Sequence, residues 1–308
     1  MKTQPSPPRP LRTSQYAADD RVFGSRAVRS PGTTEESDPE PMVQQQYARL
    51  NFFEQQLGTD ARRILDWGCG SGFNCQCLLR TPDREVTGFD VSPEAIELAR
   101  RCYPGIDFRV ADACDPELDL GAHSWDRVIS CEVLEHVPDM TAFIANLRRH
   151  LAPGGAAFVS TPNRLVFSLG YEPSPVNREH IRELTRTELL SLLAPHFNRV
   201  EIYGQRFKDS RLLERWRADV RAKIRECEAG TRWVERQPVR ARLRKWRAVD
   251  WACRVPALRD TWRAVRWRLA GRLQRALWPA RPPYLWSDFE FVIGDPHDAL
   301  WFCAVLRP

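Results

Sequence analysis

The chain has 308 residues and a mass of 35.6 kDa, with 43% hydrophobic residues, 28% charged residues and a net charge of +6. This balance is typical of a globular protein with one large domain and additions, or with two domains. No apolar run approaches the roughly 18–20 residues that cross a bilayer, and the N-terminus lacks the apolar core of a secretory signal. The nine cysteines are scattered and never adopt the C-x₂-C spacing of a zinc site. We therefore expect a cytoplasmic protein with free thiols.

Positive charge is concentrated in one part of the chain. The segment 206–281 contains 23 Lys and Arg against 8 Asp and Glu, and seven of the eleven tryptophans. The rest of the chain is therefore acidic overall. A basic, tryptophan-rich segment attached to an acidic body requires a separate explanation.

The first 41 residues contain seven prolines and few apolar residues, which predicts a disordered tail over 1–41. Helical spacing of apolar residues starts near Val43 and continues to Leu57. Strand and helix patterns then alternate. Strands are expected at 63–67, 85–90, 107–110, 125–130, 156–160 and 199–203. Helices are expected at 73–79, 93–103, 140–151 and 186–194.

This alternation predicts an α/β fold, a doubly wound parallel sheet with helices on both faces. Ala299–Leu306 (ALWFCAVL) has the pattern of one more strand. We expect the core to span 42–205 and to be completed by a final strand within 286–308. The intervening residues 206–285 are predicted to be a helical insertion of three amphipathic stretches, separated by Pro238 and Pro256.

The insertion should lie near the carboxyl edge of the sheet, because both of its connections leave from that edge. Three interpretations remain open. It is a lid over the active site, a membrane-surface element in which Trp and Leu enter the interface while Arg meets anionic headgroups, or a nucleic-acid grip. The apolar stripes favour the lid and the membrane, because a nucleic-acid face needs no continuous aliphatic stripe.

The glycine loop within ILDWGCGSGFN (Ile64–Asn74) carries the most information. Gly68, Gly70 and Gly72 leave a strand and enter a helix, where glycine allows a tight turn and close approach of a ligand. The spacing is G-x-G-x-G and not the dinucleotide pattern G-x-G-x-x-G. Asp66 precedes the loop, where a carboxylate repels a pyrophosphate but suits a cationic amino-acid ligand.

Two further acids follow the next two strands. Asp90 ends the second strand, where a carboxylate accepts hydrogen bonds from both hydroxyls of a ribose. Asp112 follows the third strand, where its side chain can take the exocyclic amine of adenine. One such acid alone would be better explained as a turn or cap residue. Three acids at successive strand ends beside this loop predict a nucleoside-type cofactor site.

As a set, these segments resemble the class I S-adenosylmethionine-dependent methyltransferases, in particular the O-methyltransferases of ubiquinone biosynthesis and of glycans. The matching pieces are LDWGCGSG, TGFDVSPEAIELAR, ADA, DRVISCEVLEHVPD and LAPGGAAFVSTPN. The resemblance implies a Rossmann-like seven-stranded sheet whose last strand is antiparallel and inserts beside the fifth. It implies S-adenosylmethionine as the cofactor. The cofactor contacts it implies are Asp66, Gly68, Cys69, Gly70, Asp90, Val91, Asp112, Ala113 and Cys131.

Candidate catalytic residues follow the fourth strand in CEVLEHV. If this segment opens a helix, Glu132, Glu135 and His136 lie on one side, where they would bind a divalent metal or supply a general base. Similar segments occur in the ubiquinone-biosynthesis enzymes, and in small-RNA terminal 2′-O-methyltransferases in which a later histidine completes the site. His180 is the candidate partner. The plainer interpretation is that His136 only packs, and a metal is compatible with the segment but not expected.

We therefore expect O-methylation of a small-molecule, glycan or lipid-linked acceptor, with His136 and His180 near the acceptor. A second interpretation is metal-dependent RNA 2′-O-methylation, and a third is a non-catalytic adenosyl-binding module. Peripheral contact with an anionic membrane at its inner surface is compatible with the basic insertion, and nucleic acid is the less expected partner.

Overall fold

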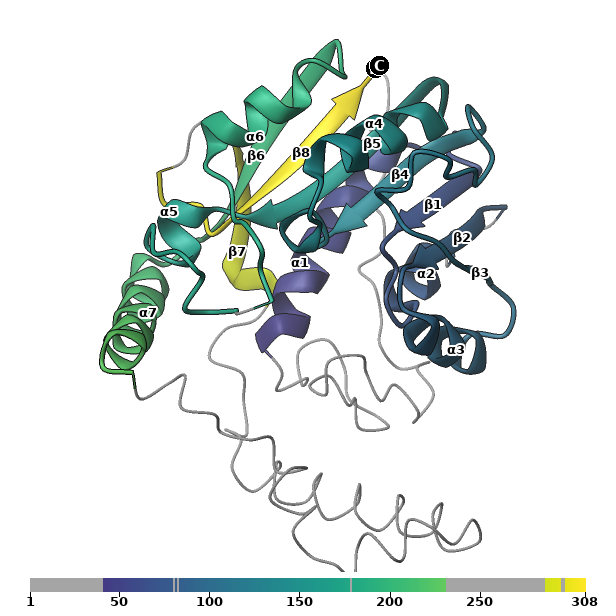
Figure 1. Ribbon diagram of the computed structural model, residues 1–308. Helices are drawn as coiled ribbons and strands as arrows, with labels where there is room; N and C mark the ends of the chain where they lie inside the picture. The colour runs from purple at the N-terminus through teal and green to yellow at the C-terminus, as the bar shows by residue number, and fades with distance from the viewer. Residues whose placement is uncertain (1–40, 80, 82, 178, 231–285, 295–296) are drawn as a thin grey trace, which may run out of the picture.

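A computed structural model describes residues 41–79, 81, 83–177, 179–230, 286–294 and 297–308 (Figure 1). Residues 1–40 of the tail predicted over 1–41, and the later two helical stretches of the insertion, within 231–285, lie outside these described residues. Within the described part, no helix is long and apolar enough to cross a membrane.

The elements alternate between strand and helix along most of the described chain. The helices are α1 (Pro41–Leu57), α2 (Phe73–Leu78), α3 (Pro93–Cys102), α4 (Met140–His150), α5 (Arg164–Phe167), α6 (Arg186–Leu193) and α7 (Ser210–Glu228). The strands are β1 (Arg63–Trp67), β2 (Glu85–Asp90), β3 (Asp107–Val110), β4 (Trp125–Cys131), β5 (Leu151–Pro162), β6 (Arg199–Phe207), β7 (Phe289–Ile293) and β8 (Trp301–Arg307). Two 3₁₀ turns are η2 (Leu134–His136) and η3 (Trp286–Asp288).

The strands form one mixed sheet in the order β3-β2-β1-β4-β5-β8-β6-β7. The first five strands run parallel, and β8 is antiparallel to both β5 and β6. The doubly wound fold and the antiparallel strand beside the fifth are therefore confirmed. The sheet has eight strands and not seven, because β7 adds an antiparallel edge strand beside β6. The single strand expected within 286–308 is thus a pair of strands.

Alternate residues of each central strand enter opposite hydrophobic cores, because successive side chains of a strand point to opposite faces. Leu65 and Trp67 of β1 pack on the face covered by α4 and α6, whereas Ile64 packs on the face of α1, α2 and α3. In β8, Ala304 and Val305 divide in the same way. Both faces are covered, as a parallel sheet requires.

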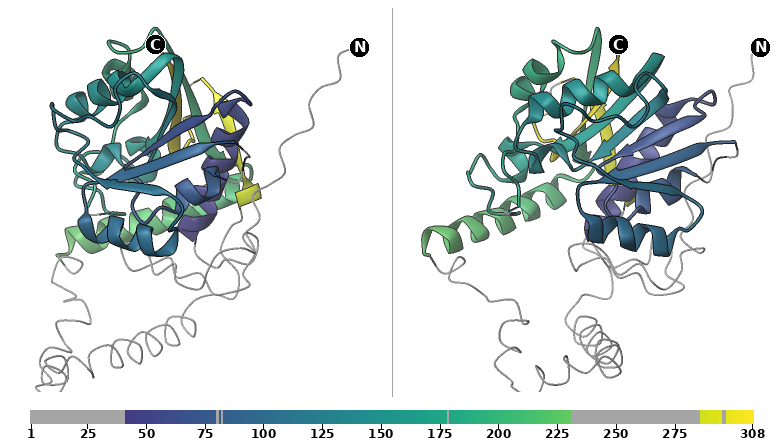
Figure 2. Two further views of the ribbon diagram at one scale, coloured as in Figure 1. Left: turned by 90° about the vertical axis from the view of Figure 1, so that its right-hand side faces the viewer. Right: turned by 45° about the vertical axis from the view of Figure 1, so that its right-hand side comes forward.

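A third, smaller core joins α1, α5, α7 and β7 at one end of the sheet. Leu213 and Val220 of α7 are buried, as the predicted apolar stripe requires. Figures 1 and 2 show α7 next to α5, with its C-terminal end standing away from the sheet. The first helix of the basic insertion is therefore anchored to the core by its N-terminal half.

Candidate functional site

The glycine loop joins β1 to α2 at the carboxyl edge of the sheet. Gly68, Gly70 and Gly72 all have positive φ, at 80°, 52° and 84°, which L side chains rarely adopt. The backbone N–H groups of Gly68 and Cys69 both donate to the carbonyl oxygen of Phe89, at 3.0 and 2.8 Å. These bonds fix the start of the loop against the end of β2.

The tip of the loop is held open by Asp90. The N–H of Gly70 donates to Oδ2 of Asp90 at 2.9 Å, and the N–H of Ser92 donates to Oδ1 at 2.9 Å. A Cβ built on Gly70 would meet no atom within 4 Å, whereas one on Gly68 would lie 2.6 Å from Val133. The loop thus packs closely on one side and leaves space for a ligand at Gly70.

Asp66 lies fully buried at the carboxyl end of β1. Its Oδ2 accepts the thiol hydrogen of Cys75 at 3.2 Å, and within the described part its Oδ1 has no hydrogen-bond partner. Burial raises the pKa of Asp66 to about 7. A buried carboxylate oxygen without a donor costs free energy, which a cationic group of a ligand would recover.

The predicted adenosine contacts follow β2 and β3. Val91 is 65% exposed although it is apolar, next to Asp90. Asp112 is exposed, and its Oδ1 accepts the N–H of Cys114 at 2.8 Å, while Ala113 is buried. An exposed apolar side chain beside two carboxylates offers a flat ring both packing and polar contacts.

The two cysteines predicted at the cofactor lie at the loop and at the end of β4. Cys69 is buried within the glycine loop. Cys131 ends β4, and burial raises the pKa of its thiol. Cys131 therefore stays protonated at neutral pH and behaves as a small apolar side chain.

The segment after Cys131 does not open an α-helix, which was the condition for Glu132, Glu135 and His136 to lie on one side. Glu132 leaves β4 with φ at 58°, and only the short 3₁₀ turn η2 follows. The Ser160 hydroxyl donates to Oε1 of Glu132 at 2.9 Å, and the Arg49 guanidinium lies 3.9 Å from Oε2. Glu132 is therefore bound to β5 and α1, and it is not part of the close group that Glu135 and His136 form with His180.

Glu135, His136 and His180 do come together. Each offers a ligand atom, and these atoms lie within 4.8 Å of one another. The two imidazole rings meet edge to face with centroids 4.8 Å apart. Thr161 donates to Oε2 of Glu135 at 3.0 Å, while Oε1 has no hydrogen-bond partner in the described part and lies 3.9 Å from Nε2 of His180. Burial raises the pKa of Glu135 well above its usual range.

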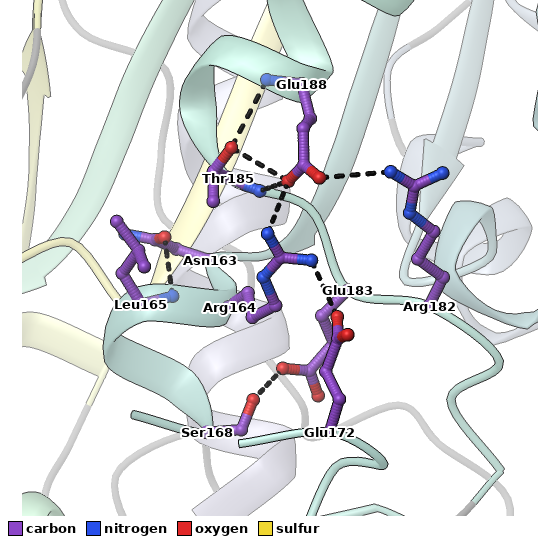
Figure 3. Close-up of polar contacts among 9 residues, drawn as sticks. All are labelled: Asn163, Arg164, Leu165, Ser168, Glu172, Arg182, Glu183, Thr185 and Glu188. Atoms are coloured by element: carbon purple, nitrogen blue, oxygen red, sulfur yellow. Dashed lines mark hydrogen bonds and ion pairs between the residues drawn. The ribbon is translucent and has the colours of Figure 1, made fainter. Parts of the chain in front are cut away.

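A residue that the sequence analysis missed supports this group. Oε1 of buried Glu183 lies 2.7 Å from Nδ1 of His180, and the Ser168 hydroxyl donates to Oε2 of Glu183 (Figure 3). Its position three residues after His180 was the only available signal. His136 is oriented differently, because its Nδ1 lies 2.9 Å from the carbonyl oxygen of Glu179.

Comparison with known proteins decides which domain this is. Residues 65–159 match the family described as a methyltransferase domain. This match identifies a methyltransferase domain at residues 65–159. A probable S-adenosylmethionine-dependent methyltransferase of Mycolicibacterium smegmatis is 39% identical over 132 residues, which are 43% of this chain and 50% of that protein. The ubiquinone biosynthesis O-methyltransferase of Xanthomonas oryzae pv. oryzae is 38% identical over 120 residues, 38% of this chain and 49% of that protein.

The methyltransferase fold extends beyond the matched segment. A solved SAM-dependent methyltransferase of Thermotoga maritima, described as a possible histamine N-methyltransferase, superposes with a TM-score of 0.50. The alignment covers 84% of this chain and 87% of that one at 14% identity, so this likeness concerns the fold alone. The chain spans about half the length of the curated relatives that it matches.

The residues of the methyltransferase domain fit S-adenosylmethionine. The free oxygen of buried Asp66 suits the ammonium of its methionine part. The open space at Gly70 admits the ligand next to the backbone, and exposed Val91 offers a surface for the base. The predicted cofactor residues thus gather at one edge of the sheet, as α/β folds require.

One helix outside the matched methyltransferase segment reaches the site. Arg49 of α1 is buried, donates to Oε1 of Gln205 at 3.1 Å and lies 5.0 Å from the ring centroid of Trp301. It also faces Glu132, so α1, β4, β6 and β8 meet at this guanidinium. The place of α1 in the core was expected, but the role of Arg49 was not, because its partners lie more than 80 residues away in the sequence.

Proposed function

We propose that the protein methylates a hydroxyl group of a small-molecule, glycan or lipid-linked acceptor. The observation that carries this proposal is the position of His136 and His180, next to the turn that packs on the glycine loop. The likeness to an enzyme named ubiquinone biosynthesis O-methyltransferase supports an oxygen acceptor.

The roles follow from the chemistry of each side chain. When bound, S-adenosylmethionine supplies a methyl group that is already activated by its sulfonium. Asp66 would hold the ammonium, Asp90 the ribose hydroxyls and Asp112 the adenine amine. His136 or His180 would receive the proton of the acceptor hydroxyl, and the remaining requirement is alignment.

The test is transfer of labelled methyl groups from S-adenosylmethionine into an extract of the source organism, separated into organic, small aqueous and RNA fractions. We expect label in the organic or small aqueous fraction. His136→Gln should reduce transfer by at least about tenfold while S-adenosylhomocysteine still binds, which fits the 10²–10⁴-fold contribution of general bases. The matched control is His123→Gln, at an exposed histidine. Equal transfer by both variants would remove His136 from the reaction.

A second candidate function is metal-dependent RNA 2′-O-methylation. The grouping of Glu135, His136 and His180 favours it, since these side chains could share one divalent cation. Against it, Glu132 is bound to Ser160 and Arg49. Label in the RNA fraction that disappears with a chelator and returns with added metal would establish this alternative over the first.

For partners, we propose peripheral contact of α7 with an anionic membrane surface. Arg215, Arg221 and Arg225 of this helix are exposed, and the opposite stripe is anchored in the core. Anionic headgroups attract such residues at roughly 1 kcal/mol each. The full chain should float with vesicles containing anionic lipid, and Arg215→Glu with Arg221→Glu should release it. Failure of the unaltered protein to float would end this proposal.

A further inference from the structure

A pocket of about 390 Å³ lies between residues 171–174 and residues 180–183. This volume is within the range of roughly 300–1,000 Å³ that small-molecule sites occupy. Its lining includes His180, Glu183, Tyr171 and Ser174. Ile181 also lines the pocket and is 62% exposed. The pocket therefore connects the buried histidine with the surface.

A single turn links this pocket to the glycine loop. Val133 packs so closely on Gly68 that a Cβ there would lie 2.6 Å from the valine side chain. Two residues later, the carbonyl oxygen of Glu135 accepts the N–H of Ile181 at 2.8 Å. The pocket thus adjoins the turn whose other side contacts the cofactor loop, which is where an acceptor has to bind.

The charged side chains around the pocket are already paired. Glu172 accepts from Arg164 at 2.6 Å, and Arg182 donates to Glu188 at 3.0 Å (Figure 3). Arg164 also reaches Glu188, at 2.9 Å. A charged ligand would have to break one of these pairs or compete with it.

The remaining carboxylate is equally occupied. Glu183 is buried, and its two oxygens face His180 and the Ser168 hydroxyl. Among the lining residues that the structure describes, each charged side chain thus already has a partner of opposite charge or a hydrogen-bond partner. The polar groups that remain are the hydroxyl of Tyr171, the hydroxyl of Ser174 and Nε2 of His180, beside the apolar wall of Ile181. The Ser174 hydroxyl accepts the N–H of Asn177 at 3.4 Å and can still donate.

We propose that this pocket binds the head group of the acceptor and that this head group is uncharged and carries several hydroxyls, as a sugar ring or a polyol does. The hydroxyls exchange hydrogen bonds with Tyr171, Ser174 and His180, and the carbon skeleton packs on Ile181. That this pocket holds the acceptor rests on the proposed methyl transfer. That it prefers an uncharged ligand rests on the ion pairs alone.

The test compares three probes that share one ring, by saturation-transfer NMR on the full chain: methyl glucoside, glucuronate and glucosamine. We expect methyl glucoside to bind at least about tenfold more tightly than the two charged probes, a difference of about 1.4 kcal/mol. Ile181→Arg should weaken methyl glucoside binding by a similar factor. Ile293→Arg, on the edge strand β7 and 60% exposed, is the matched control and should change nothing.

A second variant tests the pairing itself. Glu172→Gln leaves Arg164 with one carboxylate fewer, so this variant should gain glucuronate binding that the unaltered protein lacks. The proposal would be overturned if glucuronate or glucosamine bound to the unaltered chain as tightly as methyl glucoside does. It would also be overturned if methyl glucoside did not bind. Calorimetry with S-adenosylhomocysteine separates the two proposals: donor binding without sugar binding removes only this pocket, and sugar binding without donor binding removes methyl transfer.

Discussion

The backbone N–H of Gly70 donates a 2.9 Å hydrogen bond to the carboxylate of Asp90, and this bond joins the tip of the glycine loop to the end of β2. The other oxygen of Asp90 accepts from Ser92, which begins α3 as its N-cap. The residue expected to hold the ribose therefore also shapes the loop that receives the methionine part.

Asp90→Asn should weaken donor binding by about 10- to 100-fold, because an amide keeps one accepting oxygen and hydrogen bonds to charged groups contribute about 1.5–3 kcal/mol. Calorimetry with S-adenosylhomocysteine measures the effect. Asp107→Asn is the control, since Asp107 is an exposed acid that pairs with Arg109 within β3. Unchanged affinity in the Asp90 variant would show that the ribose is held elsewhere.

Asp66 should make donor binding pH-dependent. Its pKa is about 7 without ligand, and the donor ammonium favours the ionised carboxylate, so affinity for S-adenosylhomocysteine should rise as the pH increases through about 7. Calorimetry across this range should also detect proton release on binding. In Asp66→Asn the residual affinity should lose this rise; the same pH profile in both proteins would show that a group other than Asp66 causes it.

The same group should lower the stability of the unliganded protein at high pH. The folded state keeps a proton that the unfolded chain releases above about 3.8, so the free energy of unfolding falls as the pH rises from there to about 7. Each pH unit is worth about 1.4 kcal/mol at most. Asp66→Asn should therefore raise the melting temperature at pH 8 and leave it nearly unchanged near pH 4. A lower melting temperature at pH 8 would contradict this account.

A comparison of two glycines can distinguish the cost of backbone strain from the loss of space for the ligand. Gly70 and Gly154 both have positive φ, at 52° and 75°, and a Cβ on either meets no atom within 4 Å. Alanine at each should cost about 1–2 kcal/mol of stability, measured by urea unfolding. Only Gly70→Ala should also lose donor affinity, because its methyl group would occupy the space left for the ligand. Equal donor binding by both variants would place the ligand away from Gly70.

The start of α6 should be sensitive to acid. Burial by itself would raise the pKa of Glu188, but hydrogen bonds from Thr185 and the charges of Arg182 and Arg164 lower it to about 2. The carboxylate thus stabilises the fold above about pH 4.5, and this contribution is lost as the pH falls toward 2. Glu188→Gln should cost about 1–2 kcal/mol at pH 7 and progressively less in acid. Glu117→Gln, at an exposed acid, should show no such trend.

The strength of the sequence signal explains what could be predicted. The parallel half of the sheet has strong local patterns, and β1, β2 and β3 begin and end at the predicted residues. The spacing of Glu132 and Glu135 could not predict the turn after Cys131, because hydrogen bonds to Ser160 and Thr161 hold these two side chains in different places. These contacts join segments more than 25 residues apart, which periodicity cannot detect. Glu183 and Arg49 were missed for a related reason: the role of each depends on side chains that it contacts only in the folded protein.

The position of β8 has a consequence for how the molecule assembles. This strand follows β6 and β7 in the chain, yet it lies between them and β5. While the chain is being synthesised, the five parallel strands can pair as soon as each emerges from the ribosome. β6 and β7 cannot join the five parallel strands until β8 arrives between β5 and β6, and long-range strand pairing of this kind is slow. The half of the sheet nearest to α7 should thus be the last to become resistant to protease during translation.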